Sequence, residues 1–308
     1  MEALSDATFW LAIVACGVAS VGYWAQIVGV RPVLRRLSTE LGDGPLVASL
    51  ENDDGRAAWT ENAGRLGTLA AWAALLMLTI SMIARWQAVD YAPWSNMYEF
   101  TVAFAAGVIA FYVVFERAYG GETVDRSAAM VGAVMLPVAL SMLAVSAAFF
   151  PSDVRPLVPA LQNGDLLAIH VAAMVVSYGA LSVSFGAAVL YLVQGGGRNR
   201  FARLPKAATL DDWAYKSVML GFPLLAAGIA LGAYWANSAW GRYWGWDPKE
   251  TSALVTWLIY GVYLHMRGLR GWSGTRSAVT LVAGFGAVIF TYFIVNLWVS
   301  GLHSYAGV

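Results

Sequence analysis

Long apolar stretches separated by short polar breaks dominate the chain. Eight of them approach the roughly 20 residues that a helix needs to cross the apolar layer of a bilayer, which is about 30 Å thick. They lie at about residues 9–30, 64–85, 97–117, 128–150, 166–193, 214–236, 250–267 and 277–300. This pattern predicts an all-α polytopic membrane protein: a bundle of about eight transmembrane helices in a single integral membrane domain, residues 1–308.

The composition supports a membrane protein and argues against a nucleic-acid-binding one. The 308 residues are 59% hydrophobic and only 12% charged, with a mean hydropathy of +0.61. Soluble domains contain about 25% charged residues. The formal net charge is zero, so the total charge offers no electrostatic attraction for nucleic acid. We therefore expect no nucleic-acid partner.

The lysines and arginines predict the orientation of the bundle. With the N-terminus outside, the inner segments hold 15 of the 19 basic residues, and four fall outside: Arg85, Arg155, Arg242 and Lys249. Basic residues in short loops favour the cytoplasmic side. Both termini are therefore expected on the extracytoplasmic side. The first apolar stretch follows acidic residues and has no convincing cleavage site, so we expect a retained helix there.

Three histidines lie at two depths of the predicted bundle. His170 is about five residues into the fifth helix from the exported side, and His303 follows the eighth helix on that side. His265 is about 15 residues into the seventh helix, or roughly 22 Å at 1.5 Å per residue, near the inner boundary. Imidazole commonly binds metals and haem iron. Two exported histidines could supply both axial ligands of a flat cofactor, or each could be a hydrogen-bonded bundle residue.

The break between the sixth and seventh predicted helices, "WGRYWGWDPKE" at 240–250, gathers aromatic rings. Five fall within twelve residues: Trp235, Trp240, Tyr243, Trp244 and Trp246. An interfacial aromatic belt would instead scatter Trp and Tyr over many helix ends. The cluster is typical of a stacking floor for a large planar ligand, whose peripheral carboxylates Arg242 and Lys249 could meet. Asp247, with the proline after it, predicts a turn or helix start.

These residues carry a resemblance to a known family. The segment "WGRYWGWDPKETSALVTWLIYGVYLH" resembles the tryptophan-rich WWD signature of haem-handling proteins of c-type cytochrome biogenesis, specifically the CcsA family, also called ResC or, in some lineages, CcsB. Eight predicted helices, the KET continuation and the C-terminal "GLHSYA" fit this family. The related CcmF is much longer, and CcmC has fewer spanning helices. The resemblance covers most of the chain and is weakest over residues 1–60.

The resemblance implies roles for individual residues. His170, in "AIHVAAMVVSYG", and His303, in "GLHSYA", would be the external axial ligands of haem iron. His265 matches the family's transmembrane haem ligand, which pairs with a histidine from a ResB-type membrane partner. Between helices six and seven, residues 236–250 would form an exported WWD haem-binding loop. Its haem-contacting core would be Trp240, Trp244, Trp246 and Asp247. Asn96 and Glu99, in "PWSNMYEF", are expected to be structural residues near the cavity.

The resemblance also implies the activity. Haem b would cross the membrane, be held at the external site, and be attached through thioether bonds to an apocytochrome c with a CxxCH motif. Holocytochrome c synthase (haem-lyase) activity would require the ResB-type partner. The chain has one cysteine, Cys16, and so no dithiol of its own. A separate thiol-reducing pathway is therefore implied.

Three other functions remain open from the sequence. A purely structural assembly subunit is one, although it leaves the aromatic loop unexplained. A haem exporter or chaperone without synthase activity would use the same ligands. An ion- or proton-coupled transporter would use His265 and Glu99 as relay groups, with helix breaks at Pro137 and Pro223. For the family function, the expected location is the bacterial cell (inner) membrane with an extracytoplasmic site, and the resemblance also allows a thylakoid membrane.

Overall fold

The computed structural model describes residues 1–28, 46–89, 91–120, 128–153, 159–162, 164–201 and 204–303, with the backbone alone described at 28, 46–58, 159–160 and 270. Within these ranges there is no strand. The helices are α1 (Glu2–Val28), α3 (Leu46–Val89), α4 (Met97–Tyr119), α5 (Ala129–Phe149), the 3-10 helix η1 (Pro159–Gln162), α6 (Gly164–Val193), α7 (Ala207–Trp240), α8 (Pro248–Arg270), α9 (Thr275–Ile289), the π-helical turn η2 (Phe290–Ile294) and α10 (Val295–Trp298). The protein is all-α, as predicted.

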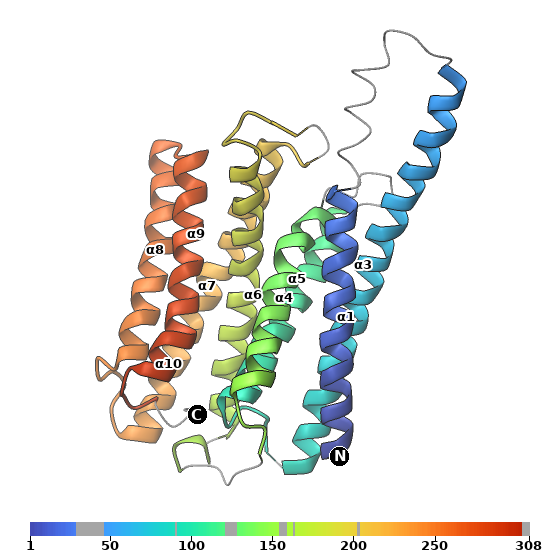
Figure 1. Ribbon diagram of the computed structural model, residues 1–308. Helices are drawn as coiled ribbons and strands as arrows, with labels where there is room; N and C mark the ends of the chain where they lie inside the picture. The colour runs from blue at the N-terminus through green and yellow to red at the C-terminus, as the bar shows by residue number, and fades with distance from the viewer. Residues whose placement is uncertain are drawn as a thin grey trace.

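The long helices run alternately up and down in one bundle (Figure 1). α1 and α3 lie side by side at one edge, α8 and α9 lie at the other, and α4, α5 and α6 lie between them. The start of α1, the start of α6, the end of α7 and the start of α8 all lie at one end of the bundle, together with α10. This end is called the loop end below. It is the end that the basic residues predict to be exported, and that orientation stays a prediction.

In the described part of the chain, seven helices are long and apolar enough to cross a membrane: α1, α3 from Trp59, α4, α5, α6, α7 and the continuous segment Thr275–Trp298. The remaining predicted span is also helical, as α8, but it is less apolar. Its hydropathy is lowered by His265 and Arg267 and by the polar groups of Tyr260 and Tyr263, which are buried in the protein core. α8 therefore runs the length of the bundle beside α9 while part of its surface is polar.

One boundary and two suggested helix breaks differ from the sequence prediction. The spans at about 9–30 and 64–85 imply a connection over about residues 31–63, but the chain is helical from Leu46 onward, and residues 29–45 lie outside the described part. Residues 46–63 contain alanines, leucines, glutamates and an arginine, which favour helix. Neither Pro137 nor Pro223 ends its helix, since both lie inside continuous helices, α5 and α7.

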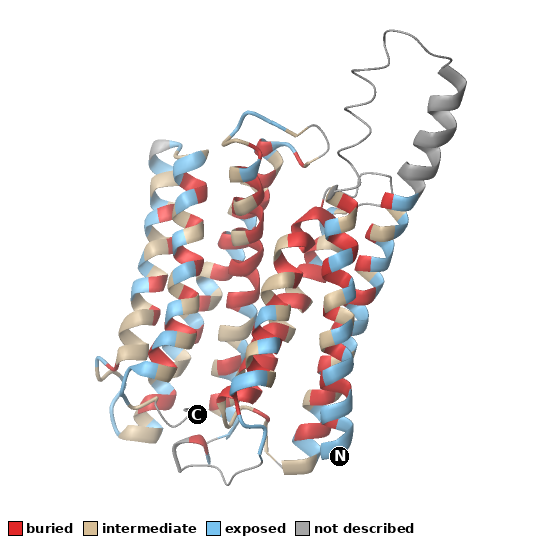
Figure 2. Ribbon diagram, in the orientation of Figure 1, coloured by how far each residue is buried: buried red, intermediate tan, exposed pale blue. Residues whose placement is uncertain are grey.

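Small residues bring the helices close together. An added Cβ on Gly22 would lie 2.8 Å from the Ala63 carbonyl oxygen, and one on Gly179 would lie 2.7 Å from the Gly107 carbonyl oxygen. Only glycine allows such approaches, which pack α1 on α3 and α4 on α6. Burial concentrates on the central helices α4 to α6, whereas the outward faces of the edge helices carry exposed apolar side chains (Figure 2). This distribution suits a protein surrounded by lipid.

The last spanning segment changes its winding near the loop end. α9 passes into the π-helical turn η2 before continuing as α10. A π-turn inserts one residue into a helix and often occurs at functional sites. Here the turn supplies Thr291 and Tyr292 to the walls of the cavities described next.

Candidate functional site

Two adjoining cavities open near the loop end. The loop-side cavity has an empty volume of about 510 Å³ and is bounded by α6, α7, α8 and Trp244 of the 241–247 loop. The α4-side cavity has an empty volume of about 660 Å³ and lies between α4, α6, Trp235 and the π-turn. Six residues line both: His170, Met174, Tyr178, Lys249, Thr291 and His303.

His170 is held against α7 by its own ring. Its Nδ1 lies 2.7 Å from the Gly228 carbonyl oxygen. A carbonyl can only accept, so Nδ1 donates and the neutral ring carries its lone pair on Nε2. Gly232 makes room for this ring, because an added Cβ there would lie 2.7 Å from the imidazole Cε1. The sequence therefore fixes both the place and the tautomer of His170.

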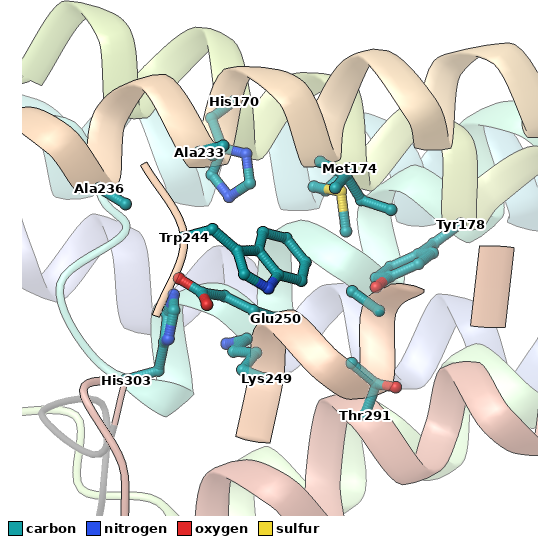
Figure 3. Close-up of a pocket in the computed structure, with 13 residues that line it drawn as sticks. His170, Met174, Tyr178, Ala233, Ala236, Trp244, Lys249, Glu250, Thr291 and His303 are labelled. Atoms are coloured by element: carbon teal, nitrogen blue, oxygen red, sulfur yellow. The ribbon is translucent and has the colours of Figure 1, made fainter. Parts of the chain in front are cut away.

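His303 lies in the segment that follows α10, and its ring lines the same two cavities. Figure 3 shows it at the loop-side cavity. Its Nδ1 lies 2.7 Å from Oδ2 of Asp247, and its side chain is 18% exposed. The Trp240 ring meets the imidazole edge to face at 4.9 Å between centroids. When the ring is neutral, Nδ1 donates to the carboxylate and Nε2 carries the lone pair. Metal-binding histidines commonly have this arrangement, in which an acceptor orients the ring and fixes its tautomer.

Asp247 connects the aromatic loop, α8 and the C-terminal segment. It caps α8, accepting from the Lys249 backbone amide at 3.2 Å, while Glu250 accepts from the amides of Asp247 and Gly245 at 3.1 and 2.9 Å. The other oxygen, Oδ1, accepts from the Leu302 amide at 2.5 Å. The sequence-predicted helix start at Asp247 is confirmed. The same carboxylate also positions His303, which sequence reasoning did not predict.

The electrostatic environment favours neutral His303 beside ionised Asp247. Burial lowers the pKa of His303 from 6.5, although the Asp247 carboxylate opposes this effect. Burial alone would raise the pKa of Asp247, but hydrogen bonds from His303 and the Leu302 amide outweigh burial and lower it. Burial also lowers the pKa of the Lys249 ammonium, to about 8. At neutral pH the imidazole can therefore act as a ligand.

The structure divides the predicted aromatic floor. Trp244 lines the loop-side cavity, and in Figure 3 its indole lies between His170 and His303. Trp240 does not line either cavity but packs on His303 and on the buried Trp235. Tyr243 and Trp246 are 56% and 69% exposed.

The outward position of Trp246 has a backbone cause. Its φ is +55°, a left-handed conformation that is uncommon for residues other than glycine. Arg242 is also exposed, beside the backbone of Gly245, and does not line either cavity. Lys249, in contrast, lines both cavities.

His265 lies apart from the other two histidines. It is in the last two turns of α8, far from the loop end, and its side chain is exposed. No hydrogen bond to its ring is found among the described residues. The structure thus brings together His170 and His303 and leaves His265 on the outer surface of the bundle.

Sequence reasoning missed several cavity residues because they lie inside apolar helices. Met174 and Tyr178 follow His170 at intervals of four residues, so they share its face of α6. Helical spacing from a candidate ligand is a signal that could have identified them. Phe100 and Phe104, also four residues apart, supply the α4 wall in the same way.

Asn96 and Glu99 organise the start of α4. The Asn96 side chain caps the helix by accepting from the Glu99 amide at 2.9 Å. Glu99 is 3% exposed and pairs with the buried Arg85, its Oε1 lying 2.9 Å from Nε. The other carboxylate oxygen accepts from the backbone and hydroxyl of Ser95. These contacts fit the structural role expected for the two residues.

Comparison with known proteins gives consistent results. Residues 94–303 match the family described as "Cytochrome C assembly protein". The "Cytochrome c biogenesis protein CcsA" of Synechococcus elongatus is 37% identical over 290 residues, which cover 78% of this chain and 87% of that protein. The protein of the same name from Trieres chinensis is 32% identical over 283 residues, covering 80% and 88%. The expected resemblance to CcsA is confirmed.

A solved structure has a similar fold. "Cytochrome c Heme Lyase CcmF" aligns with a TM-score of 0.62 at 19% identity, covering 95% of this chain and 46% of that chain. This chain therefore spans less than half the length of that protein. At such low identity the similarity concerns the fold alone, a multi-helix membrane bundle.

Proposed function

The chain belongs to the cytochrome c assembly protein family, and from this premise we propose that it holds haem at the loop end and presents it for attachment to apocytochrome c. A role in cytochrome c biogenesis and a multi-pass membrane location follow from the family and from the seven apolar helices. One observation carries the finer proposal. His170 and His303 each bind an acceptor through Nδ1 at 2.7 Å and line the same two cavities.

Haem b is the proposed substrate. Its iron takes two imidazole nitrogens as axial ligands, and a neutral ring that donates from Nδ1 offers its Nε2 lone pair. Aromatic side chains suited to a flat apolar ring system line the cavities, including Trp244, Tyr178, Phe100 and Phe104. In this proposal residues 236–250 are the exported haem-binding loop of a single membrane domain.

The exposed aromatic residues of this loop receive a more peripheral role than the cavity residues. Trp240 and Asp247 act through His303, which they pack against and orient. Tyr243, Trp246 and Arg242 would meet haem only at the rim of the cavity. Trp244 and Lys249 remain the proposed direct contacts from the loop.

His265 is proposed to act with a partner. It shares the outward face of α8 with a stripe of exposed apolar side chains at helical spacing: Val255, Leu258, Val262 and Leu269. A ResB-type membrane helix packed on this stripe would bring a second histidine to the haem. A single histidine on an outer apolar surface would then be one ligand of a pair whose second histidine comes from the partner.

Attachment would follow at the loop end. Each thiol of a CxxCH motif adds across one haem vinyl double bond, so sulfur and hydrogen are both transferred without a net change of electrons. The chain would orient the haem and exclude competing reactions. The histidine of the motif would then replace one axial ligand and allow release. Cys16 is buried in α1 and not near the cavities, so a separate pathway must keep the substrate thiols reduced.

The first experiment is a visible absorption spectrum of the protein purified with its ResB-type partner. A reduced bis-imidazole haem spectrum that weakens or shifts in both His170→Ala and His303→Ala is expected. A folded complex that binds no added haem would exclude this function.

A second assay separates synthesis from haem delivery alone. Attachment of haem to a CxxCH apocytochrome is measured with and without the partner. Covalent product only with both proteins supports the synthase complex, whereas haem binding without any covalent product supports the exporter or chaperone.

A further inference from the structure

Lys249 is a partly buried cation in the wall of both cavities. Its ammonium donates to Oδ1 of Asn296 at 2.8 Å and lies 6.0 Å from the centre of the Phe100 ring. Among the described residues no carboxylate oxygen lies within 4.0 Å of this ammonium. Removing a charge from water is costly unless an opposite charge accompanies it. Among the described residues the hydrogen-bond partner of the ammonium is a neutral amide.

The neighbouring carboxylates are engaged elsewhere. Asp247 accepts from His303 and from the amides of Leu302 and Lys249. Glu250 accepts from the amides of Gly245 and Asp247. Either carboxylate would have to give up the cap of α8 to reach the ammonium. Figure 3 shows Lys249 beside Glu250 and facing the space across from His170.

Trp235 also lines the α4-side cavity and carries a donor that the described residues leave unsatisfied. Its side chain is 1% exposed, and its indole Nε1 is buried without a hydrogen-bond partner among the described residues. A buried N–H of this kind costs free energy until it meets an acceptor. Much of the remaining wall is apolar, with Phe100, Phe104 and Val171 among its residues.

We propose that Lys249, assisted by Trp235, receives a carboxylate of the bound ligand inside the α4-side cavity and so makes the site selective for an anionic planar ligand. This inference rests on the proposed haem function and extends it. One haem carboxylate lies within the bundle, between α6, α8 and the π-turn, rather than both lying at the exported surface. Arg242 is too far out to perform this task, because it does not line either cavity.

The test compares haem with its dimethyl ester, which keeps the ring and iron but has no free carboxylate. Dissociation constants are measured by absorption titration in detergent for the wild type, Lys249→Met and Lys216→Met. Lys216 is an exposed lysine paired with Asp212 and serves as the matched control. We expect the wild type to bind haem roughly 10- to 100-fold more tightly than the ester, as for a charged hydrogen bond. Lys249→Met should lose this preference because its haem dissociation constant rises while its ester dissociation constant stays that of the wild type.

Each result has one meaning. If Lys249→Met binds the ester as the wild type does, the variant is folded. Lys249→Arg keeps a positive charge and should retain most of the preference for haem. Trp235→Phe should weaken haem binding by a smaller factor and leave the ester unaffected. The inference is overturned if Lys249→Met weakens both ligands equally, or if only Arg242→Met removes the preference. Binding of neither ligand by the wild type overturns the proposed function itself.

Discussion

The two histidine regions of this protein differ in how completely one chain builds them. At the loop end, His170 and His303 both have their Nδ1 atoms fixed at 2.7 Å from an acceptor and line shared cavities. Near the other end, His265 is exposed on α8 among apolar side chains. The first region is a preorganised pair within the chain. The second has the form of half a pair.

This difference teaches what an oriented histidine requires. A ring used as a ligand needs a second contact that fixes its tautomer, and the loop end supplies one from a helix carbonyl and one from a carboxylate. Nothing comparable holds His265 in the described part of the chain. In the proposed complex its orientation would come from the partner that packs on α8.

The largest expected effect separates the two regions directly. Without a partner, His170→Ala should weaken haem binding more than about 100-fold, because changes in the groups that merely orient a ligand already cost about 10- to 100-fold. His265→Ala should alter the spectrum only in the complex with the ResB-type protein. Absorption titrations of both variants, with and without the partner, measure this. Loss of haem from the isolated His265→Ala chain would remove the distinction.

A smaller effect is expected from Asp247→Asn. Asparagine is a good helix cap, so α8 should keep its start while His303 loses the carboxylate that orients it. We expect haem affinity to fall by about 10- to 100-fold. The control is Asp153→Asn, an exposed residue in the connection after α5. Equal affinities for Asp247→Asn and the wild type would mean that His303 needs no such support.

Gly232→Ala should perturb His170 without touching its chemistry. The added methyl would lie 2.7 Å from the ring, whereas an added methyl on Gly286 would meet nothing within 4 Å. We expect roughly tenfold weaker haem binding for Gly232→Ala, about 1.4 kcal/mol, and no change for Gly286→Ala. If both variants bind like the wild type, the space beside His170 is not limiting.

The smallest effect concerns protonation of His303 in the haem-free protein. Because burial lowers the pKa of His303, the midpoint at which the imidazolium loses its proton as the pH rises should lie below pH 6.5. Asp247→Asn should lower the midpoint further, since the carboxylate favours the protonated ring. Histidine-labelled NMR titrations, assigned with His170→Gln and His265→Gln, report the midpoint. A midpoint above 6.5 would show that Asp247 outweighs burial.

Hydropathy predicted the architecture well because spanning helices must be long and apolar. Eight helical segments were expected and eight long helices occur among the described residues, yet α8 is less apolar than the rest. Its tyrosines and Arg267 face the protein, where Arg267 pairs with Asp211 at 2.7 Å. Counting apolar residues predicts the length of such a helix, but it does not show which of its faces is buried in the protein and which faces lipid.

The site was predictable only in part. The depth of His170 and the position of His303 placed both near one end, because rise per residue converts sequence distance into depth. The roles of the aromatic residues were not predictable in this way. Within one short loop, the left-handed backbone of Trp246 leaves that ring exposed while Trp244 lines the cavity. Whether a tryptophan of this loop is exposed or lines the cavity depends on backbone φ angles, which the residue type does not determine.

The contact between Asp247 and the Leu302 amide also bears on the timing of the protein's own assembly. It joins residues 55 positions apart in the chain. The chain is synthesised from its N-terminus, so α6, α7 and α8 are made before His303, and at that stage the pair of histidines does not yet exist. The site is completed when the final spanning segment has inserted and its end has folded back onto the start of α8. The haem capture proposed for this site would therefore be a late event, which a half-inserted chain could not perform.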